Sequence, residues 1–192
     1  TDIEGTIEQT IRVIEKGAEM VRITVPTLKE IDSLKEIVTL LREKGYKTPI
    51  IADVHYLPEV AESVATFVDK VRINPGNFVD KREFKSIDLT DEEYNESVAK
   101  MALKAKSLIE VCNKHNTAIR IGVNQGSLCD RIVSRYGNTS LAMVQSALEW
   151  IQICQQYDFH NIVFSLKSSN VNTMLEATSL LAQKMDEQGT RY

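Results

Sequence analysis

Charged and polar residues occupy every second position of one predicted strand. In "KVRINPGN" (residues 70–77), Arg72 and Asn74 alternate with Val71 and Ile73. Because successive strand residues point to opposite faces of a sheet, the two polar residues share one face and the two apolar residues share the other. Strands that are buried on both faces normally read as continuous runs of Val, Ile and Leu. The alternation therefore predicts that one face of the sheet carries a binding site.

The same alternation occurs in four other predicted strands, at residues 20–26, 48–56, 117–127 and 161–170. Across the five strands, the polar face carries four cations and one carboxylate. A buried cation without a partner costs several kcal/mol, and one aspartate cannot neutralise four cations. An anion is therefore expected among them, and planar guanidinium groups suit phosphate oxygens. The candidate binding residues are Arg22, Asp53, His55, Arg72, Asn74, Arg120, Asn124, Ser165 and Lys167.

Two of these strands end in turns that contain glycine and small polar residues. The turns are "NPGN" (residues 74–77) and "NQGS" (residues 124–127). Glycine allows a ligand to approach the backbone closely, and we expect N–H groups of these turns to face the anion.

Structural roles remain open for several of the candidates. Arg22 and Asp53 could form a purely structural ion pair, Lys167 could extend into solvent, and His55 could be a core histidine with satisfied hydrogen bonds. Three residues outside the polar faces are interpreted as structural: His115, His160 and Trp150.

Predicted helices alternate with the strands along the whole chain. Apolar residues recur with the period of a helix over residues 3–18, 28–45, 58–67, 97–116, 140–158 and 171–189. A strand followed by a helix, repeated five times, predicts parallel strands that are joined by right-handed crossovers.

An open doubly wound sheet and a (β/α)8 barrel both satisfy this order. No G-x-G-x-x-G follows the first strand, which weakens the dinucleotide-binding form of the open sheet. A complete barrel needs about 250 residues and eight strands. The chain has about five strands, opens on a helix and stops at Tyr192 directly after one. We therefore expect an α/β fold that is an incomplete (β/α)8 TIM barrel, without its first strand and its last two. Open strand edges are expected to pair between copies.

Composition favours one ordinary globular domain over residues 1–192. Hydrophobic residues make up 43% and charged residues 26%. The net charge of −4 argues against a nucleic-acid binder, and no apolar run approaches the length of a membrane span. No signal peptide is visible, although the chain does not begin with Met. Three widely spaced cysteines predict buried free thiols of a cytosolic protein: Cys112, Cys129 and Cys154.

One charged stretch, residues 78–96, has no clear periodicity. It is interpreted as an irregular insertion, which is either a solvated loop or a lid over an active site, because barrels place their sites on the side that follows the strands.

Five motifs in order resemble a known family. They are "VRITVP", "ADVHY", "VRINPGN", "RIGVNQGSL" and "SLKSSNV", which together span almost the whole chain. They are similar to the barrel domain of the 4-hydroxy-3-methylbut-2-enyl diphosphate synthases of the methylerythritol phosphate pathway of isoprenoid biosynthesis. Departures are mild, as at Val54 and Tyr56. The long segment between "RINPGN" and "RIGVN" resembles the three-domain form of some bacteria and of plastids.

The resemblance implies an iron–sulfur oxidoreductase. The family reductively opens the ring of 2-C-methyl-D-erythritol 2,4-cyclodiphosphate and removes one oxygen as water, which yields hydroxymethylbutenyl diphosphate. A 4Fe-4S cluster on a separate C-terminal domain receives electrons from ferredoxin or flavodoxin. The enzyme is a homodimer in which the cluster domain of one subunit closes over the barrel of the other. A cytoplasmic bacterial protein is expected, with the plastid stroma as the alternative, and no nucleic acid or membrane is expected as a partner.

The resemblance also assigns roles by motif position. Arg22, Arg72, Arg120 and Lys167 would hold the diphosphate, Asn74, Asn124 and Ser165 would add neutral hydrogen bonds, and Asp53 and His55 would orient the other groups. The cysteine ligands of the cluster, including a C-x-x-C pair, have no counterpart here, and the glutamate of the family's "GVTEAG" motif would fall beyond Tyr192. No metal ligand or catalytic residue is therefore expected in these 192 residues, and no turnover is expected from them alone.

Two other functions remain open. A dihydropteroate-synthase-like barrel also needs cations at its strand ends but no iron. A non-catalytic anion-binding module would bind phosphate without structural selectivity.

Overall fold

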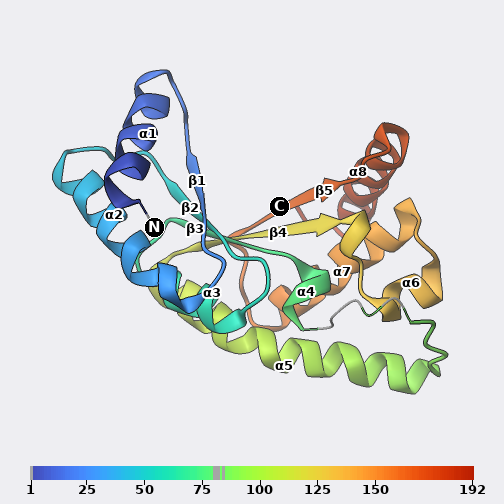
Figure 1. Cartoon of the computed structure of the whole chain (residues 1–192). Helices are drawn as coiled ribbons and strands as arrows, with labels where there is room; N and C mark the ends of the chain where they lie inside the picture. The colour runs from blue at the N-terminus through green and yellow to red at the C-terminus, as the bar shows by residue number, and fades with distance from the viewer. Residues whose placement is uncertain (1, 80–82, 84) are drawn as a thin grey trace.

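The computed structural model describes residues 2–79, 83 and 85–192, and its central feature is a parallel sheet (Figure 1). In this part of the chain the sheet has five strands, in the order β1-β2-β3-β4-β5. A doubly wound sheet reverses its strand order at a switch point, whereas the wall of a barrel keeps the order of the sequence. The observed order therefore confirms the barrel type, and the sheet is not closed. The strands are β1 (Val21–Thr24), β2 (Ile50–Asp53), β3 (Lys70–Ile73), β4 (Ala118–Asn124) and β5 (Ile162–Lys167).

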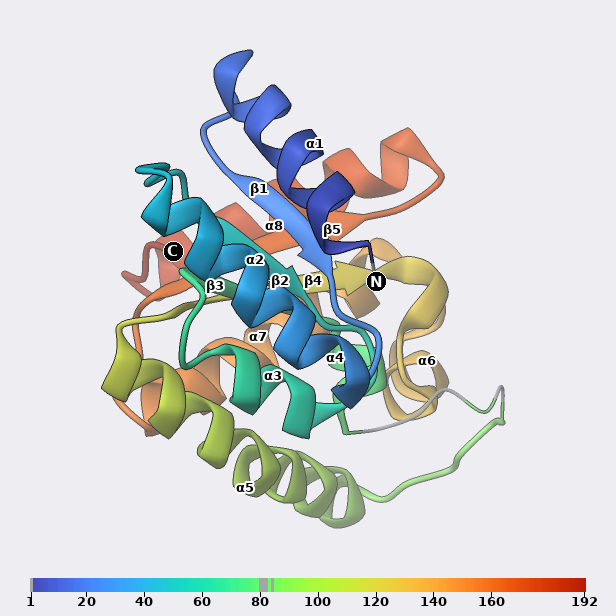
Figure 2. The same cartoon turned by 60° about the vertical axis from the view of Figure 1, so that its left-hand side comes forward.

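Helices cover the outer side of this curved sheet, and its concave side opens upwards in Figure 1. Helices α1, α2, α3 and α5 pack on one another in this order around the outside, as the turned view in Figure 2 shows. The described helices are α1 (Ile3–Glu15), α2 (Ile31–Glu43), α3 (Pro58–Val64), α4 (Pro75–Phe78), α5 (Asp91–His115), α6 (Asp130–Tyr136), α7 (Ser140–Gln156) and α8 (Val171–Glu187), with short 3-10 turns η1 (Leu28–Glu30) and η2 (Gln125–Ser127).

The apolar positions of the strands form the core between sheet and helices. Val71 and Ile73 of β3 and Ile119 and Ile121 of β4 are fully buried, as the alternation predicted. Trp150 of α7 is also fully buried, which confirms its structural interpretation. Since one face of each strand is committed to this core, the polar face is free to point into the concave side of the sheet.

The prediction of an irregular segment over residues 78–96 is wrong for residue 78, which ends α4, and for residues 91–96, which form the start of α5. Thr90 caps this helix, because its side chain accepts from the backbone N–H of Glu93 while the Glu93 carboxylate accepts from the N–H of Thr90. Acidic side chains in a first turn are favoured by the helix dipole. The charge run that suggested a loop is therefore in part the beginning of a helix.

Residues 80–82 and 84 of the same segment lie outside the described residues. Two short elements were not predicted at all, namely α4 directly after β3 and α6 after β4. None of the helices that the structure describes is both long and apolar enough to span a bilayer.

Candidate anion-binding site

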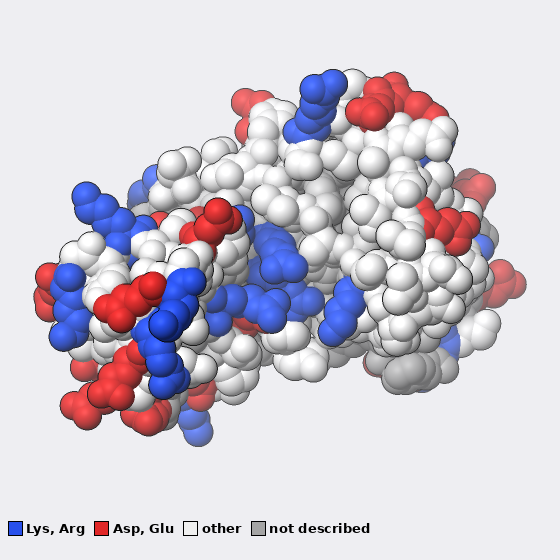
Figure 3. All heavy atoms as spheres, turned by 90° about the horizontal axis from the view of Figure 1, so that it is seen from above, with Lys and Arg blue, Asp and Glu red and all other residues white. Residues whose placement is uncertain are grey.

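A cavity of about 470 Å³ lies at the carboxyl ends of the strands on the concave side of the sheet. Seen from above in Figure 3, a group of blue Arg and Lys side chains gathers in the central hollow of this face. The volume falls within the usual range for small-molecule sites. Its polar lining comes from all five strands and the turn after β2: Arg22, Thr24, Asp53, His55, Arg72, Arg120, Asn124, Ser165 and Lys167.

Asp53 connects three of these side chains. It is only 4% exposed and lies between Thr24 and Arg72 in the register of the sheet. Its Oδ1 accepts from Arg72 Nη1 at 3.1 Å and lies 3.4 Å from His55 Nε2, while its Oδ2 lies 3.4 Å from Arg22 Nε. The Arg22–Asp53 ion pair that the sequence left open is therefore present, but the carboxylate is shared with Arg72.

Arg72 is held flat against the next strand. Its side chain is 11% exposed, and its Nη2 donates to the carbonyl oxygen of Gly122 at 3.4 Å. A Cβ at position 122 would lie 2.5 Å from Arg72 Nε, closer than such atoms approach, and 3.0 Å from Nη2, which is also a tight contact. Gly122 therefore creates the space in which this guanidinium group lies. A glycine inside a predicted strand was the available signal for such a close approach.

Arg120 lies directly beside Arg72 in the register of β3 and β4. Its Nε donates to Ser165 Oγ at 3.1 Å. In the part of the chain that the structure describes, no carboxylate lies within ion-pair distance of Arg120. Burial lowers the pKa of this guanidinium, and the positive charges of Arg22 and Arg72 lower it further. Arg120 therefore carries a positive charge that its surroundings stabilise poorly, and an anion in the cavity would offset the repulsion from Arg22 and Arg72.

The cavity as a whole is positively charged. Its lining includes three arginines and one lysine but a single carboxylate, Asp53, which leaves a formal excess of three positive charges when His55 is neutral. Lys167 is paired with Asn124 in the register of β4 and β5, so both side chains lie at the same level of the cavity. Preorganised cations of this kind bind anions strongly, because their arrangement costs little at the moment of binding.

Asn74 differs from its prediction. Asn74 is not one of the described residues that line the cavity. Its side chain is buried, donates from Nδ2 to Ser127 Oγ at 2.8 Å and accepts from the N–H of Gly76 at 3.3 Å. The strand ends at Ile73, so strand alternation no longer fixes the direction of the Asn74 side chain. Asn74 caps α4 rather than facing the cavity.

The glycine N–H groups that were expected to face the anion have other acceptors. The N–H of Gly76 donates to Asn74, and the N–H of Gly126 donates to Oδ1 of Asn124 at 3.2 Å. Side-chain cations therefore make up most of the polar donors that the cavity offers.

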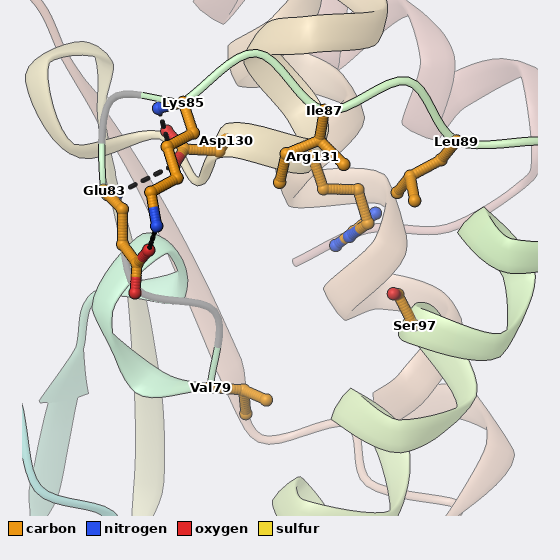
Figure 4. Close-up of a pocket in the computed structure, with 8 residues that line it drawn as sticks. All are labelled: Val79, Glu83, Lys85, Ile87, Leu89, Ser97, Asp130 and Arg131. Atoms are coloured by element: carbon orange, nitrogen blue, oxygen red, sulfur yellow. Dashed lines mark hydrogen bonds and ion pairs between the residues drawn. The ribbon is translucent and has the colours of Figure 1, made fainter.

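A second cavity of about 470 Å³ lies beside the charged segment that precedes α5 (Figure 4). Asp130 accepts there from the backbone N–H of Glu83 at 2.8 Å and of Lys85 at 3.1 Å, which anchors the segment on α6. Arg131 faces the same space, but its guanidinium forms two 2.9 Å hydrogen bonds with the buried carboxylate of Glu149. Its charge is therefore already matched, and the lid role of the segment stays a prediction.

The cysteines do not fit an iron–sulfur cluster. Cys112, Cys129 and Cys154 are free and buried, and burial raises the pKa of Cys112 and of Cys154 to about 12. Cluster ligands are thiolates, which such burial disfavours. No group of three potential metal ligands occurs within residues 2–79, 83 and 85–192.

Comparison with known proteins adds independent information. A family model described as the GcpE TIM-barrel domain matches residues 1–188. The chain is 50% identical, over 96% of its length, to the 4-hydroxy-3-methylbut-2-en-1-yl diphosphate synthase (flavodoxin) of Protochlamydia amoebophila, and covers 28% of that protein. It is 45% identical, over its whole length, to the chloroplastic ferredoxin-dependent synthase of Arabidopsis thaliana, and covers 26% of it.

The chain thus spans less than a third of the length of these curated relatives. The family match covers nearly all of its residues and agrees with the strand order and helix arrangement of the sheet. The chain belongs to the GcpE TIM-barrel domain family.

Proposed function

We propose that the protein converts 2-C-methyl-D-erythritol 2,4-cyclodiphosphate to 4-hydroxy-3-methylbut-2-enyl diphosphate, and that this chain binds the diphosphate. One observation carries the proposal. Four cations from β1, β3, β4 and β5 line one cavity that contains a single carboxylate. The names of the relatives support it, because they specify a synthase of this product that works with flavodoxin or ferredoxin.

The cations of the cavity suit the charge that develops in this reaction. Ring opening turns a cyclic diphosphate into a linear one and so increases its negative charge. Arg72 is fixed by Asp53 and Gly122, and Arg120 is fixed by Ser165, so neither guanidinium has to reorganise when that charge appears. Arg22 and Lys167 are more exposed and would complete the contacts at the mouth of the cavity.

Electron delivery is part of the same proposal but uses no residue described above. A 4Fe-4S cluster would supply the electrons, and the cysteines of this chain do not fit it, so we derive no step through it. We infer that flavodoxin or ferredoxin serves as the donor, as in the names of the relatives. A cytoplasmic homodimer belongs to the same proposal and rests on the family resemblance alone.

Isothermal titration of the full-length protein with the cyclodiphosphate tests the proposal. Arg72→Ala and Arg120→Ala should each weaken binding by about 10- to 150-fold, because each removes a charge-assisted hydrogen bond of about 1.5–3 kcal/mol. Arg12→Ala is the matched control, since Arg12 is an exposed arginine of α1 outside the cavity. Its affinity should equal that of the unaltered protein.

Unchanged affinity in both cavity variants would refute the diphosphate role. Equal affinity of the unaltered protein for inorganic phosphate, pyrophosphate and the cyclodiphosphate would indicate an anion-binding module instead. Full-length protein that is colourless after strictly anaerobic purification would favour a barrel of the dihydropteroate-synthase type.

A further inference from the structure

Side-chain hydrogen bonds connect the ends of three neighbouring strands just outside the cavity. The residues that line the cavity stop at Asn124 on β4 and Lys167 on β5. The next residues along the chain, Gln125 and Ser168, are bonded to each other, because Ser168 Oγ donates to Gln125 Oε1 at 2.5 Å. This bond lies one residue beyond the register pair Asn124–Lys167 and therefore fixes the two strand ends relative to each other.

A second bond connects β4 to β3. Asn74, which follows β3 directly, donates to Ser127 Oγ at 2.8 Å, and Ser127 Oγ in turn donates to the carbonyl oxygen of Asn124 at 3.3 Å. The backbones are also in close contact here, since a Cβ at Gly76 would lie 1.7 Å from the carbonyl oxygen of Ser127. The turn after β3 and the turn after β4 are therefore packed together without space between them.

The bond between Gln125 and Ser168 is continued away from the cavity at both of its ends. Gln125 Nε2 donates to the carbonyl oxygen of Asn138 at 3.0 Å, in the segment before α7. Ser168 Oγ accepts from the backbone N–H of Asn170, the capping residue of α8, at 3.0 Å. The strand ends are thus tied to the helices that support them as well as to one another.

We propose that Gln125, Ser127 and Ser168 are positioning residues, which set the spacing of the cavity cations without touching the ligand. We call this set, together with Asn74, the strand-end belt. The inference rests on the proposed function, because the cations that it positions are those that would hold the diphosphate. The bonds of the belt join the carboxyl ends of β3, β4 and β5, the strands that carry Arg72, Arg120 and Lys167.

Binding of inorganic pyrophosphate to variants of the full-length protein tests the proposal. Ser127→Ala and Ser168→Ala each remove a hydroxyl of the belt and should raise the Kd by about three- to tenfold, as expected for the loss of one neutral hydrogen bond. Ser168→Thr retains the hydroxyl and should restore the affinity. Ser179→Ala makes the same chemical change at an exposed position of α8 and should leave the Kd unchanged.

The cycle of Gln125→Ala with Ser168→Ala isolates their shared bond. The double variant should lose less affinity than the two single variants lose together, because the shared bond is broken in both of them, whereas the bonds of Gln125 to Asn138 and of Ser168 to Asn170 are each lost in one. Unchanged affinity in Ser127→Ala and Ser168→Ala, or failure of Ser168→Thr to restore binding, would overturn the proposal.

Failure of the unaltered protein to bind pyrophosphate or the cyclodiphosphate would instead reject the proposed function. The belt is then decided by hydrogen exchange at the buried amide of Gly76 in Ser127→Ala. Gly76 donates to Asn74, which would lose the Ser127 hydroxyl of η2 as its partner, so faster exchange than in Ser179→Ala supports the belt. An unchanged exchange rate contradicts it.

Discussion

Replacing Gly122 by alanine should fill the space in which the Arg72 guanidinium lies. The added Cβ would be 2.5 Å from Arg72 Nε and 3.1 Å from its Cζ, and the carbonyl oxygen of Gly122 is itself an acceptor of Arg72. The guanidinium must therefore move away from β4. Its bond to Asp53 at 3.1 Å then lengthens or breaks. The fold has little reason to change, because Gly122 does not adopt a positive φ that only glycine tolerates.

The magnitude follows from the contacts that Arg72 loses. A displaced guanidinium forfeits at least one charge-assisted hydrogen bond to the bound anion, which is worth about 1.5–3 kcal/mol. That corresponds to a rise of about 10- to 150-fold in the Kd for pyrophosphate. Gly126→Ala provides the control, since the nearest atom that a Cβ at that position meets among the described residues is Asn124 Oδ1 at 3.7 Å, an ordinary contact. Its Kd should stay within about twofold of the unaltered value.

Titration calorimetry on Gly122→Ala, Arg72→Ala and the double variant completes the test. If Gly122 acts through Arg72, alanine at position 122 has no further effect once Arg72 has been removed. Equal losses of affinity from Gly122→Ala in the presence and absence of Arg72 would refute the reasoning. So would unaltered binding by Gly122→Ala.

Two further predictions concern the core. Glu149→Gln should lower the free energy of unfolding, measured by urea denaturation, by about 3 kcal/mol. The substitution removes the carboxylate that is bonded to the Arg131 guanidinium, and both side chains are only 4% exposed. An unchanged urea midpoint would show that the ion pair contributes nothing. Burial raises the pKa of the Cys112 and Cys154 thiols from 9.0 to about 12. Both thiols should therefore react with iodoacetamide at pH 8 only after unfolding. For the same reason, the free energy of unfolding should decrease as the pH rises from 9 towards 12. Alkylation of either thiol in the folded protein at pH 8 would contradict this.

Strand alternation was sufficient to predict most of the candidate site. Residues of one parity in neighbouring parallel strands meet on one face, and the register places Arg72 beside both Asp53 and Arg120. The strand order then identifies a barrel wall, because consecutive strands are neighbours. The positions of the cavity cations were therefore predictable from the sequence.

The features that could not be predicted depend on contacts between distant turns. Asn74 has the right parity, but it lies beyond the last strand residue, and its direction is set by Ser127, which is far away in the sequence. Gly122 is neither polar nor apolar in the strand alternation, so the alternation assigns it no role. Its role follows only from the path of the Arg72 side chain in the structure. The beginning of α5 depends on a capping box at Thr90, which hydrophobic periodicity does not detect.

The neighbouring arginines of β3 and β4 have a consequence for how this domain can change during evolution. Arg120 has a lowered pKa, so folding disfavours its protonated form relative to the unfolded chain. A neutral side chain of similar size at that position would relieve the repulsion from Arg72 and make the ligand-free domain harder to unfold. Selection for stability alone would therefore remove this charge, and under the proposed function its presence is a trade-off in which ligand capture outweighs the stability of the empty fold.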